Sequence, residues 1–323
     1  MNVLILGGHG FIGSHVANQI KKYPNINVHI IDVHHQYNEY PDWEYDIVLK
    51  QRLDHIGDHN YYSGDVTDQT FMEEVFDNVK PDYVIDLATY PNAKMVNRNV
   101  VDATTNMITA TAIALECSAR HNVKRFVLAS SSMVYGDFGK YNGAPDEQCE
   151  CDPLTIYGSY KLQCEKMCKI YEQNCGLEYS ILRPSALYGT RDMVVRVISK
   201  LTVGAIKNGT MTVQGPDNKL DFSWVEDVAE AFIEATMHPN AANQIFNCTR
   251  GNGRKIIDAA EIIKPRIPSK IITEPHDSFY PNRDTLDSSK LKALTNWNPS
   301  VDIEDGIPQY LDWFLNQKYL SYF

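Results

Sequence analysis

The stretch that decides the fold is VLILGGHGFIG, residues 3–13. Its short apolar run is typical of a buried strand, and the segment 11–20 has the pattern of a helix. Between them, Gly7 allows a sharp turn, Gly10 lets the backbone approach a pyrophosphate, and Gly13 lets helix and strand pack closely. The start of the helix offers unpaired N–H groups to an anion. The stretch therefore predicts a strand, a phosphate-binding turn and a helix.

An acidic residue, Asp32, ends the next apolar run about 20 residues further on. A carboxylate in that place can accept both hydroxyls of a ribose, and it would repel a 2′-phosphate. The next three residues, Val33, His34 and His35, bring no arginine or lysine. Asp32 therefore favours NAD over NADP. The alternative is that the glycines form only a tight turn and that Asp32 only ends a strand.

The first half of the chain continues as alternating strands and helices. Apolar runs at 61–62, 83–87, 125–129 and 179–183 alternate with helical patterns near 68–78, 99–121 and 156–174. Continuously apolar strands joined by helices indicate a parallel sheet covered on both faces. We expect an α/β fold with a Rossmann-like, doubly wound parallel sheet. The polar segment between Asp32 and Asn60 is interpreted as an insertion with a short helix around 43–53.

After Arg183 the alternation weakens, and glycines and prolines punctuate the chain. We therefore expect a dinucleotide-binding domain over residues 1–183 and a smaller C-terminal α/β substrate-binding lobe over 184–323. A strand at 243–248 is expected to return to the main sheet, so that about 222–249 fold back onto the first domain.

Composition narrows the classes of function. The 323 residues allow about two domains, and 43% hydrophobic with 22% charged residues predicts a packed core. The net charge is 30 − 41 = −11, which disfavours nucleic acid as a partner. No apolar run approaches the ~18–20 residues that span a bilayer, and the N-terminus lacks the basic segment of a signal peptide. We expect no membrane partner.

Cysteine usage predicts a location and argues against a metal site. The seven cysteines are an odd number without framework spacing, which indicates reduced thiols in a cytoplasm. Cys149 and Cys151 lack a second ligand pair of matching spacing, so no metal is expected.

Tyr157 and Lys161 are four residues apart in a predicted helix, so their side chains share one face. An unperturbed phenol keeps its proton to about pH 10. To work as a base near neutral pH, its anionic form needs roughly 4 kcal/mol of electrostatic stabilisation. One cation about 4 Å away in a half-wet site supplies that amount. Tyr157 is therefore a candidate base. The alternative is a chance spacing on an exposed helix; Tyr160 has no lysine four residues further on.

Further segments complete a pattern along the chain. They are GDVTD at 64–68, DLAT at 86–89, Asn106, SSSMVYG at 130–136, LRPSALYG at 182–189, LDFSWVEDV at 220–228 and Arg283. Together with the glycine and Tyr-Lys motifs, the chain resembles the extended short-chain dehydrogenase/reductase superfamily over nearly its whole length. The resemblance is to the NAD-dependent nucleotide-sugar epimerases and dehydratases in particular.

The resemblance implies roles for individual residues. Ser131, Tyr157 and Lys161 correspond to the catalytic group, with Ser131 four residues before the tyrosine of V-Y-G. The implied cofactor-binding residues are Gly7, Gly10, Phe11, Ile12, Gly13, Asp32, Asp65, Val66, Leu87, Ala88, Thr89, Asn106, Tyr157, Lys161, Pro184 and Ser185. The implied substrate-binding residues are Ser131, Ser132, Met133, Tyr157, Arg191 and Arg283.

The sequence departs from the family pattern in two respects. Ala186 and Leu220 stand where the family often has an asparagine and an arginine on the substrate phosphates, so two diphosphate contacts are missing. Lys219, Arg191, Arg196 and Arg283 are candidates to replace them. Ser132 and Met133 stand where the 4,6-dehydratases carry an Asp-Glu pair, and neither side chain moves protons as a carboxylate does.

The resemblance implies an NAD-dependent epimerase for a nucleotide-diphosphate sugar. It would transfer a hydride reversibly at a sugar carbinol, expected at carbon 4, through a keto sugar. One alternative is a nucleotide-sugar 4-dehydrogenase or reductase that releases the keto sugar. An alternative of another class is a non-catalytic NAD-binding scaffold or sensor, which the retained Ser131, Tyr157 and Lys161 disfavour.

A homodimer is also implied by the resemblance. In the family, the helices that correspond to 99–121 and 156–174 pair across a two-fold axis. Ile108, Ala112, Leu115 and Met167 are candidate contributors to that interface, with ordinary core packing as the alternative.

Overall fold

The computed structural model describes residues 1–34, 42–193 and 196–316. Its central strands are β1 (Asn2–Leu6), β2 (Asn27–Asp32), β3 (Asn60–Ser63), β4 (Tyr83–Asp86), β5 (Arg125–Ala129), β6 (Glu178–Arg183) and β10 (Gln244–Asn247). They form one parallel sheet in the order β10-β6-β5-β4-β1-β2-β3. The predicted α/β, Rossmann-like fold is confirmed. Because the chain runs outward in both directions from β1, the crevice between β1 and β4 is the expected ligand site.

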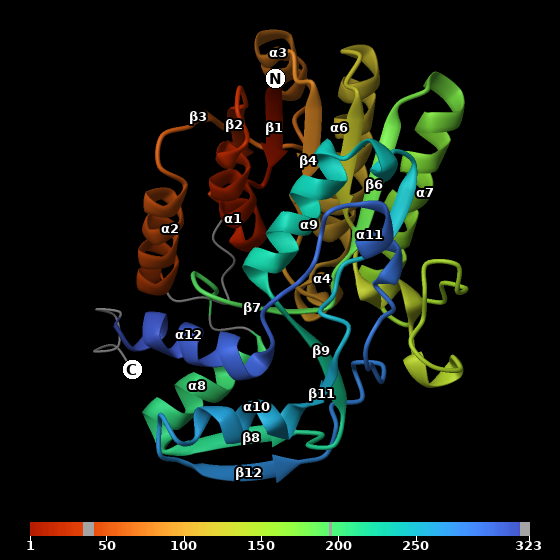
Figure 1. Cartoon of the computed structure of the whole chain (residues 1–323). Helices are drawn as coiled ribbons and strands as arrows, with labels where there is room; N and C mark the ends of the chain where they lie inside the picture. Colours follow the sequence, from red (N-terminus) through yellow and green to blue (C-terminus); the bar gives the residue numbers. More distant parts are fainter. Residues whose placement is uncertain (35–41, 194–195, 317–323) are drawn as a thin grey trace.

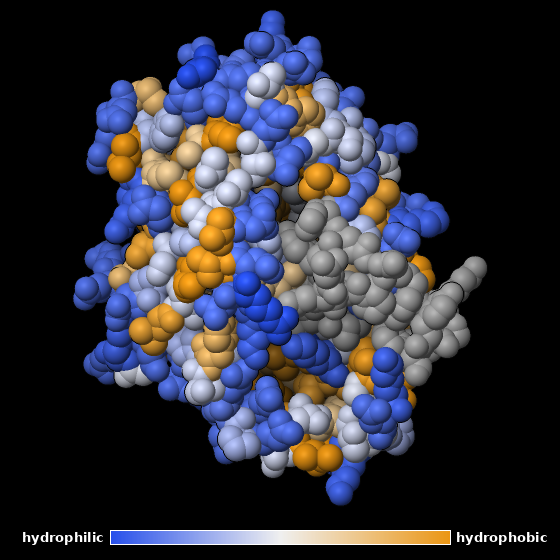
Figure 2. Space-filling view, turned by 180° about the vertical axis from the view of Figure 1, so that it is seen from behind, coloured by the Kyte–Doolittle hydropathy of each residue, from blue (hydrophilic) through white to orange (hydrophobic). Residues whose placement is uncertain are grey.

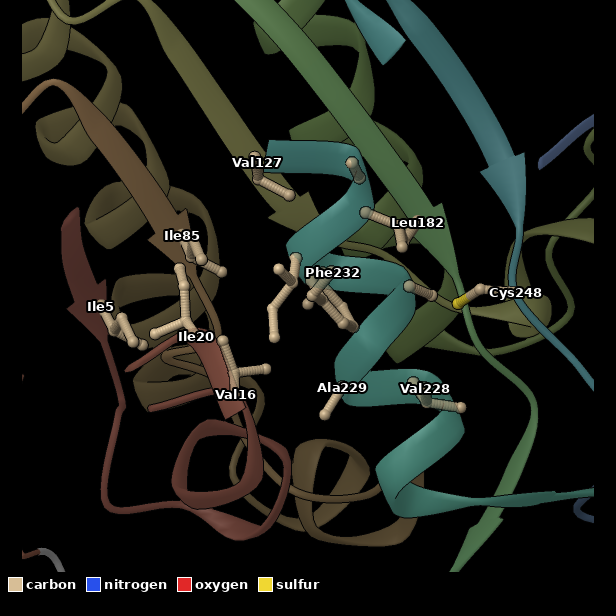
Figure 3. Close-up of a cluster of buried hydrophobic side chains, with 14 of the residues drawn as sticks. Ile5, Val16, Ile20, Ile85, Val127, Leu182, Val228, Ala229, Phe232 and Cys248 are labelled. Carbon is tan, nitrogen blue, oxygen red and sulfur yellow. The ribbon is translucent and has the colours of Figure 1, made fainter. Parts of the chain in front are cut away.

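Helices cover both faces of this sheet (Figure 1). One face carries α1 (Phe11–Gln19) and α9 (Val225–Met237), and the other carries α3 (Gln69–Val79), α6 (Ala110–Arg120) and α7 (Ile156–Cys175). Figure 3 shows the first of these cores, in which Phe232 and Val228 of α9 lie among side chains of the sheet and of α1. Both side chains are fully buried. Each Å² of apolar surface removed from water contributes about 25 cal/mol to stability. These two buried layers are therefore the main source of the stability of the fold.

The helical path before α6 differs from the single helix predicted over 99–121. The segment consists of α4 (Ala93–Arg98), α5 (Val100–Thr104), a π-helical turn (Thr105–Thr109) and then α6. A π turn inserts one residue and rotates the side chains that follow, which a 3.6-residue pattern does not reveal. Asn106 lies in this turn, where its side-chain amide donates to the carbonyl of Asp102 at 3.0 Å.

The helix expected near 43–53 is α2 (Asp42–Ile56), which lies beside α1 (Figure 1). Short 3₁₀ segments occur at Ile20–Lys22, Ser132–Tyr135, Phe138–Lys140 and Pro239–Ala241. On the face seen in Figure 2, hydrophilic residues dominate and hydrophobic residues form small scattered groups. Within the described ranges, no helix combines the length and the apolar character that crossing a membrane requires.

The C-terminal part of the chain adds a second, smaller α/β layer. Its strands are β7 (Ala186–Tyr188), β9 (Lys219–Trp224) and β11 (Gly253–Lys255) in one sheet, and β8 (Thr210–Gln214) and β12 (Lys270–Glu274) in another. Its helices are α8 (Val197–Asn208), α10 (Ile256–Ile263) and α12 (Ile303–Leu315). The helix α11 (Ser289–Leu294) instead packs against β10 and the core of the main sheet. Buried aromatic residues such as Phe222, Trp224 and Phe314 form its core. From this lobe the chain returns through α9 and β10 to the main sheet; the domain boundary at residue 183 stays a prediction.

Candidate active site

A cavity of about 420 Å³ lies at the carboxyl edge of the main sheet. Loops after β1, β2, β3, β4, β5 and β6 all contribute to its walls. Every residue of the predicted cofactor set lines it, from Gly7 to Ser185, and so do Ser131, Tyr157 and Lys161. Residues that are up to 178 positions apart in the sequence are thus brought to one cavity, since 185 − 7 = 178.

The glycine loop forms a cradle that side chains would fill. Gly7 has a φ of +73°, and a Cβ built on it would lie 2.9 Å from the amide nitrogen of Ala88. A Cβ on Gly13 would lie 2.4 Å from the carbonyl oxygen of Gly7. No side chain caps the start of α1. The first-turn N–H groups are therefore left for a ligand, which is the donor set that a phosphate requires.

Asp32 ends β2 at the same cavity. Its Oδ2 accepts from the backbone N–H of His9, and its Oδ1 accepts from that of His34, both at 3.0 Å. Each carboxylate oxygen can accept further hydrogen bonds. These two backbone contacts orient the carboxylate at the strand end, where two ribose hydroxyls would be accepted. His35 lies outside the described residues.

The helix α7 brings Tyr157 and Lys161 beside Ser131. Thr155 caps α7 by accepting from the N–H of Gly158 at 3.1 Å, which places Tyr157 in the first turn. A Cβ on Gly158 would lie 2.5 Å from the carbonyl oxygen of Met133, so only glycine permits this approach of α7 to the segment that follows Ser131. The Nζ of Lys161 is 5.9 Å from the centre of the Tyr157 ring. The two side chains thus share one face of α7 at the cavity.

Buried hydrogen bonds fix the lysine and the serine. Lys161 is 4% exposed, and its Nζ donates to the carbonyl of Ala129 at 2.7 Å. The Oγ of Ser131 accepts from the N–H of Met133 at 3.2 Å. Tyr160, the neighbouring tyrosine, is held elsewhere, because its hydroxyl lies 2.8 Å from Oγ1 of Thr104. The two tyrosines therefore differ in surroundings as well as in sequence spacing.

A buried ion pair, Arg183–Glu165, connects the strands and the helix that carry the predicted catalytic residues. The guanidinium of Arg183 donates to both oxygens of Glu165, at 2.9 and 2.6 Å, and both side chains are at most 3% exposed. Ser130 donates to the same carboxylate at 2.5 Å. Because Ser130 directly follows β5, Glu165 lies on α7 and Arg183 ends β6, these contacts join the ends of both strands to the helix of Tyr157.

Asp86 is a buried carboxyl close to the lysine. Its Oδ1 accepts from the N–H of Ala88 at 3.2 Å and its Oδ2 from Thr111 at 3.3 Å. Burial raises the pKa of Asp86 to about 6, while the positive charge of Lys161 and the two hydrogen bonds oppose that rise. Asp86, buried behind the cavity-lining Leu87 and Ala88, thus titrates nearer to neutral pH than an ordinary aspartate.

Four predicted substrate-binding residues do not line this cavity. Ser132 is fully buried, with its hydroxyl donating to that of Ser185 at 3.2 Å, and Met133 is 6% exposed. Arg191 lines a separate hollow together with His55. Arg283 lies outside the cavity walls, and burial lowers its pKa. Their substrate-binding roles stay predictions.

The two positions that depart from the family pattern lie in the lobe. Leu220 is 5% exposed in the lobe core, and Ala186 packs against the same cluster. Neither lines the cavity. Their apolar side chains serve the packing of β7 and β9.

Sequence reasoning missed a wall of the cavity. α2 contributes Tyr45, Leu49 and Arg52, and the segment before α8 contributes Asp192 and Met193. The same segment contributes Arg196, which the sequence suggested only as a replacement contact for the substrate diphosphate. The first three are spaced i, i+4 and i+7, which is the spacing of one helix face. That spacing was available in the sequence, but nothing in it shows that the face turns toward the glycine loop.

Comparison with known proteins agrees with the cofactor cavity described above. The sequence model of the NAD dependent epimerase/dehydratase family matches residues 3–249. A putative UDP-glucose 4-epimerase of Methanocaldococcus jannaschii is 28% identical, over 98% of this chain and 99% of that protein. A trifunctional UDP-glucose 4,6-dehydratase/epimerase/reductase of Arabidopsis thaliana is 26% identical over 97% of this chain, which spans about half (47%) of that protein's length.

A solved structure shares the fold. It is the UDP-glucuronic acid 4-epimerase from Bacillus cereus in complex with UDP-glucuronic acid and NAD. The TM-score is 0.87 at 24% sequence identity, with 98% of this chain and 99% of that one covered.

Proposed function

The chain belongs to the NAD dependent epimerase/dehydratase family, and we propose that it is a nucleotide-sugar epimerase acting at one sugar carbinol, at carbon 4. The observation that carries the proposal is the single cavity that Ser131, Tyr157 and Lys161 share with the glycine loop. A scaffold that only bound a dinucleotide would not require a buried lysine beside a tyrosine at the same cavity.

NAD is the cofactor of this family, and the residues present fit it. The side-chain-free glycine cradle and the uncapped start of α1 would hold the diphosphate, and Asp32 and Lys161 would hold the two riboses. Bound there, NAD would supply the reversible hydride chemistry at the carbinol carbon.

The chain's own residues would manage the proton. The phenolate oxygen of Tyr157 takes the proton from the sugar hydroxyl as the C–O single bond becomes a carbonyl, and the same phenol returns a proton when the carbonyl is reduced. The hydroxyl of Ser131 donates a hydrogen bond to that sugar oxygen. Lys161, held by the carbonyl of Ala129, stabilises the phenolate by its charge. Reduction on the opposite face of the keto sugar inverts the carbinol with no net oxidation.

The substrate we propose is a nucleotide-diphosphate sugar, with UDP-hexoses as the first to test. The name of the Methanocaldococcus jannaschii relative and the ligand of the Bacillus cereus structure support that choice. Ser132 and Met133, both buried and neither acidic, favour epimerisation over dehydration, because elimination of water needs a further proton-transfer group.

Assembly, location and domain roles complete the proposal. We propose a homodimer that uses α5 and α7, supported by the exposed Val101 (84%) and Ile170 (49%) on those helices. Leu115 does not contribute to this surface, since it is fully buried within the protomer. We place the enzyme in the cytoplasm on its seven free cysteines. Residues 1–183 with 222–249 would bind NAD, and residues 184–323 the sugar nucleotide.

The test is a panel of UDP-sugars incubated with the purified chain. The proposal predicts conversion of one sugar to its carbon-4 epimer, resolved by chromatography, with no steady rise in absorbance at 340 nm. Stoichiometric NADH with a released keto sugar would instead identify a dehydrogenase. Loss of water from the sugar, seen as an 18-Da decrease by mass spectrometry, would identify a dehydratase.

A further inference from the structure

Arg52 is a buried cation that faces the cavity from α2. The residue is 8% exposed, and it belongs to the cavity wall. Its guanidinium donates to the carbonyl of Arg191 from Nε at 3.0 Å and from Nη2 at 2.9 Å, and to the carbonyl of His9 from Nη1 at 3.4 Å. These bonds use three of the five N–H groups of the side chain. In the described part of the chain, no carboxylate forms a salt bridge with it.

Two carboxylates act on the charge of Arg52, and both are held by other partners. Asp192, 3% exposed, is the first carboxylate, and it already forms a salt bridge with Nη1 of Arg196. Asp32, at the end of β2, is the second carboxylate, and its two oxygens accept from the backbone N–H groups of His9 and His34. The guanidinium of Arg196 lies 4.9 Å from the centre of the Phe11 ring, the first residue of α1. Both guanidiniums are therefore close to the glycine loop.

A buried charge that no carboxylate contacts directly is costly, and a directly bound anionic ligand would reduce that cost. Burial lowers the pKa of Arg52 to about 10, with the charge of Asp192 opposing and that of Arg196 adding to the shift. The side chain still carries its charge at neutral pH. The contact with the carbonyl of His9 ties it to the loop whose N–H groups are also without a capping side chain. Two independent features thus favour an anion at one place.

We propose that Arg52, assisted by Arg196, binds the diphosphate of the dinucleotide at the glycine loop. The insertion between β2 and β3 would thereby supply the cation that the loop itself lacks, since residues 7–13 contain no lysine or arginine. The inference rests on dinucleotide binding at this loop, and it is independent of which sugar is epimerised.

The test compares ligands with and without phosphates on the full chain. Titration calorimetry measures the affinities of NAD, ADP and adenosine for the wild type and for Arg52→Gln, which keeps amide donors for the two carbonyls but loses the charge. A hydrogen-bonded charge contact predicts a roughly 10- to 100-fold loss of affinity for NAD and ADP. Adenosine affinity should be unchanged. Lys50→Gln, on the exposed side of α2, is the matched control and should change none of the three.

Equal losses for ADP and adenosine, or no loss for either, would overturn the inference. A larger effect on NADP than on NAD would also overturn it, by placing Arg52 at the ribose 2′ position. If Arg52→Gln does not fold, Arg52→Lys and Arg196→Gln decide the question, each with a smaller loss for ADP and a weaker salt dependence of its binding. Failure of the wild type to bind ADP would contradict the cofactor site itself. Failure to epimerise any sugar would leave these binding results valid.

Discussion

The loop after β1 and the segment after β7 differ in how they present the residues that their sequences single out. The first presents Gly7, Gly10 and Gly13 to the cavity, where the ligand groups are main-chain N–H groups and empty space. In the second, the side chain of Arg191 lines another hollow while its carbonyl accepts from Arg52. A site made by the backbone follows from local sequence, whereas a site made by long side chains depends on which neighbours they meet.

The largest expected effect concerns the ion pair that joins the two strand ends to α7. Arg183→Met should lower the free energy of unfolding by about 3–5 kcal/mol, because Glu165 is left as an uncompensated buried charge. Chemical denaturation measures this loss. The double variant with Glu165→Leu should recover most of it. Lys124→Met, at an exposed salt bridge on the same sheet, should change stability by less than about 1 kcal/mol.

The raised pKa of Asp86 predicts that the stability of the fold depends on pH. Its folded pKa of about 6 lies above the ordinary 3.8, so the folded state binds the proton more tightly than the unfolded state. The contribution of this group to stability therefore falls as pH rises from about 4 to about 6 and is constant above that. Asp86→Asn should remove this fall, so its stability relative to the wild type should increase by about 3 kcal/mol between pH 4 and pH 7. A constant difference across that range would contradict the prediction.

Asp82→Asn is the control of opposite sign. A hydrogen bond from Lys124 lowers the pKa of Asp82, so the stability from that pair is present at neutral pH and is lost as pH falls. The Asp82→Asn variant should therefore lose stability at neutral pH and approach the wild type in acid.

Gly10→Ala sharpens the comparison at the glycine loop. Gly10 has a φ of −68°, and a Cβ there would meet only the carbonyl oxygen of Gly7, at 3.0 Å. The variant should fold with nearly unchanged stability. Its new methyl group occupies the cradle, where a bound diphosphate would have to lie. Such overpacking costs about 1–3 kcal/mol, so NAD affinity should fall about 10-fold or more. Unchanged NAD affinity would show that the diphosphate does not contact this turn.

Arg283→Gln tests the lobe, and its expected effect is the smallest. If Arg283 reaches the substrate diphosphate, KM for the sugar nucleotide should rise about 10-fold, while NAD affinity stays unchanged. Arg191→Gln is the companion variant. If KM rises for neither variant, these arginines do not replace the two substrate contacts that are missing at Ala186 and Leu220.

Much of the fold could be predicted because its signals are local. Apolar runs gave the seven strands of the main sheet, and β10 pairs with β6 although more than 60 residues separate them. The π turn at Thr105–Thr109 was missed, because the position of one extra residue within a helix depends on packing that a 3.6-residue pattern does not reveal. The cofactor residues were found by spacing, but Arg52 was not, since its role depends on the packing of α2 beside α1.

The central claim is that Tyr157 is the proton-transferring group at the cofactor cavity. It is tested most directly by kcat of Tyr157→Phe on the sugar that the wild type converts, with Tyr160→Phe as the matched control on the same helix. The account predicts that Tyr157→Phe lowers kcat by about 10²- to 10⁴-fold without changing NAD affinity, while Tyr160→Phe stays close to the wild type. Wild-type turnover by Tyr157→Phe would contradict the claim.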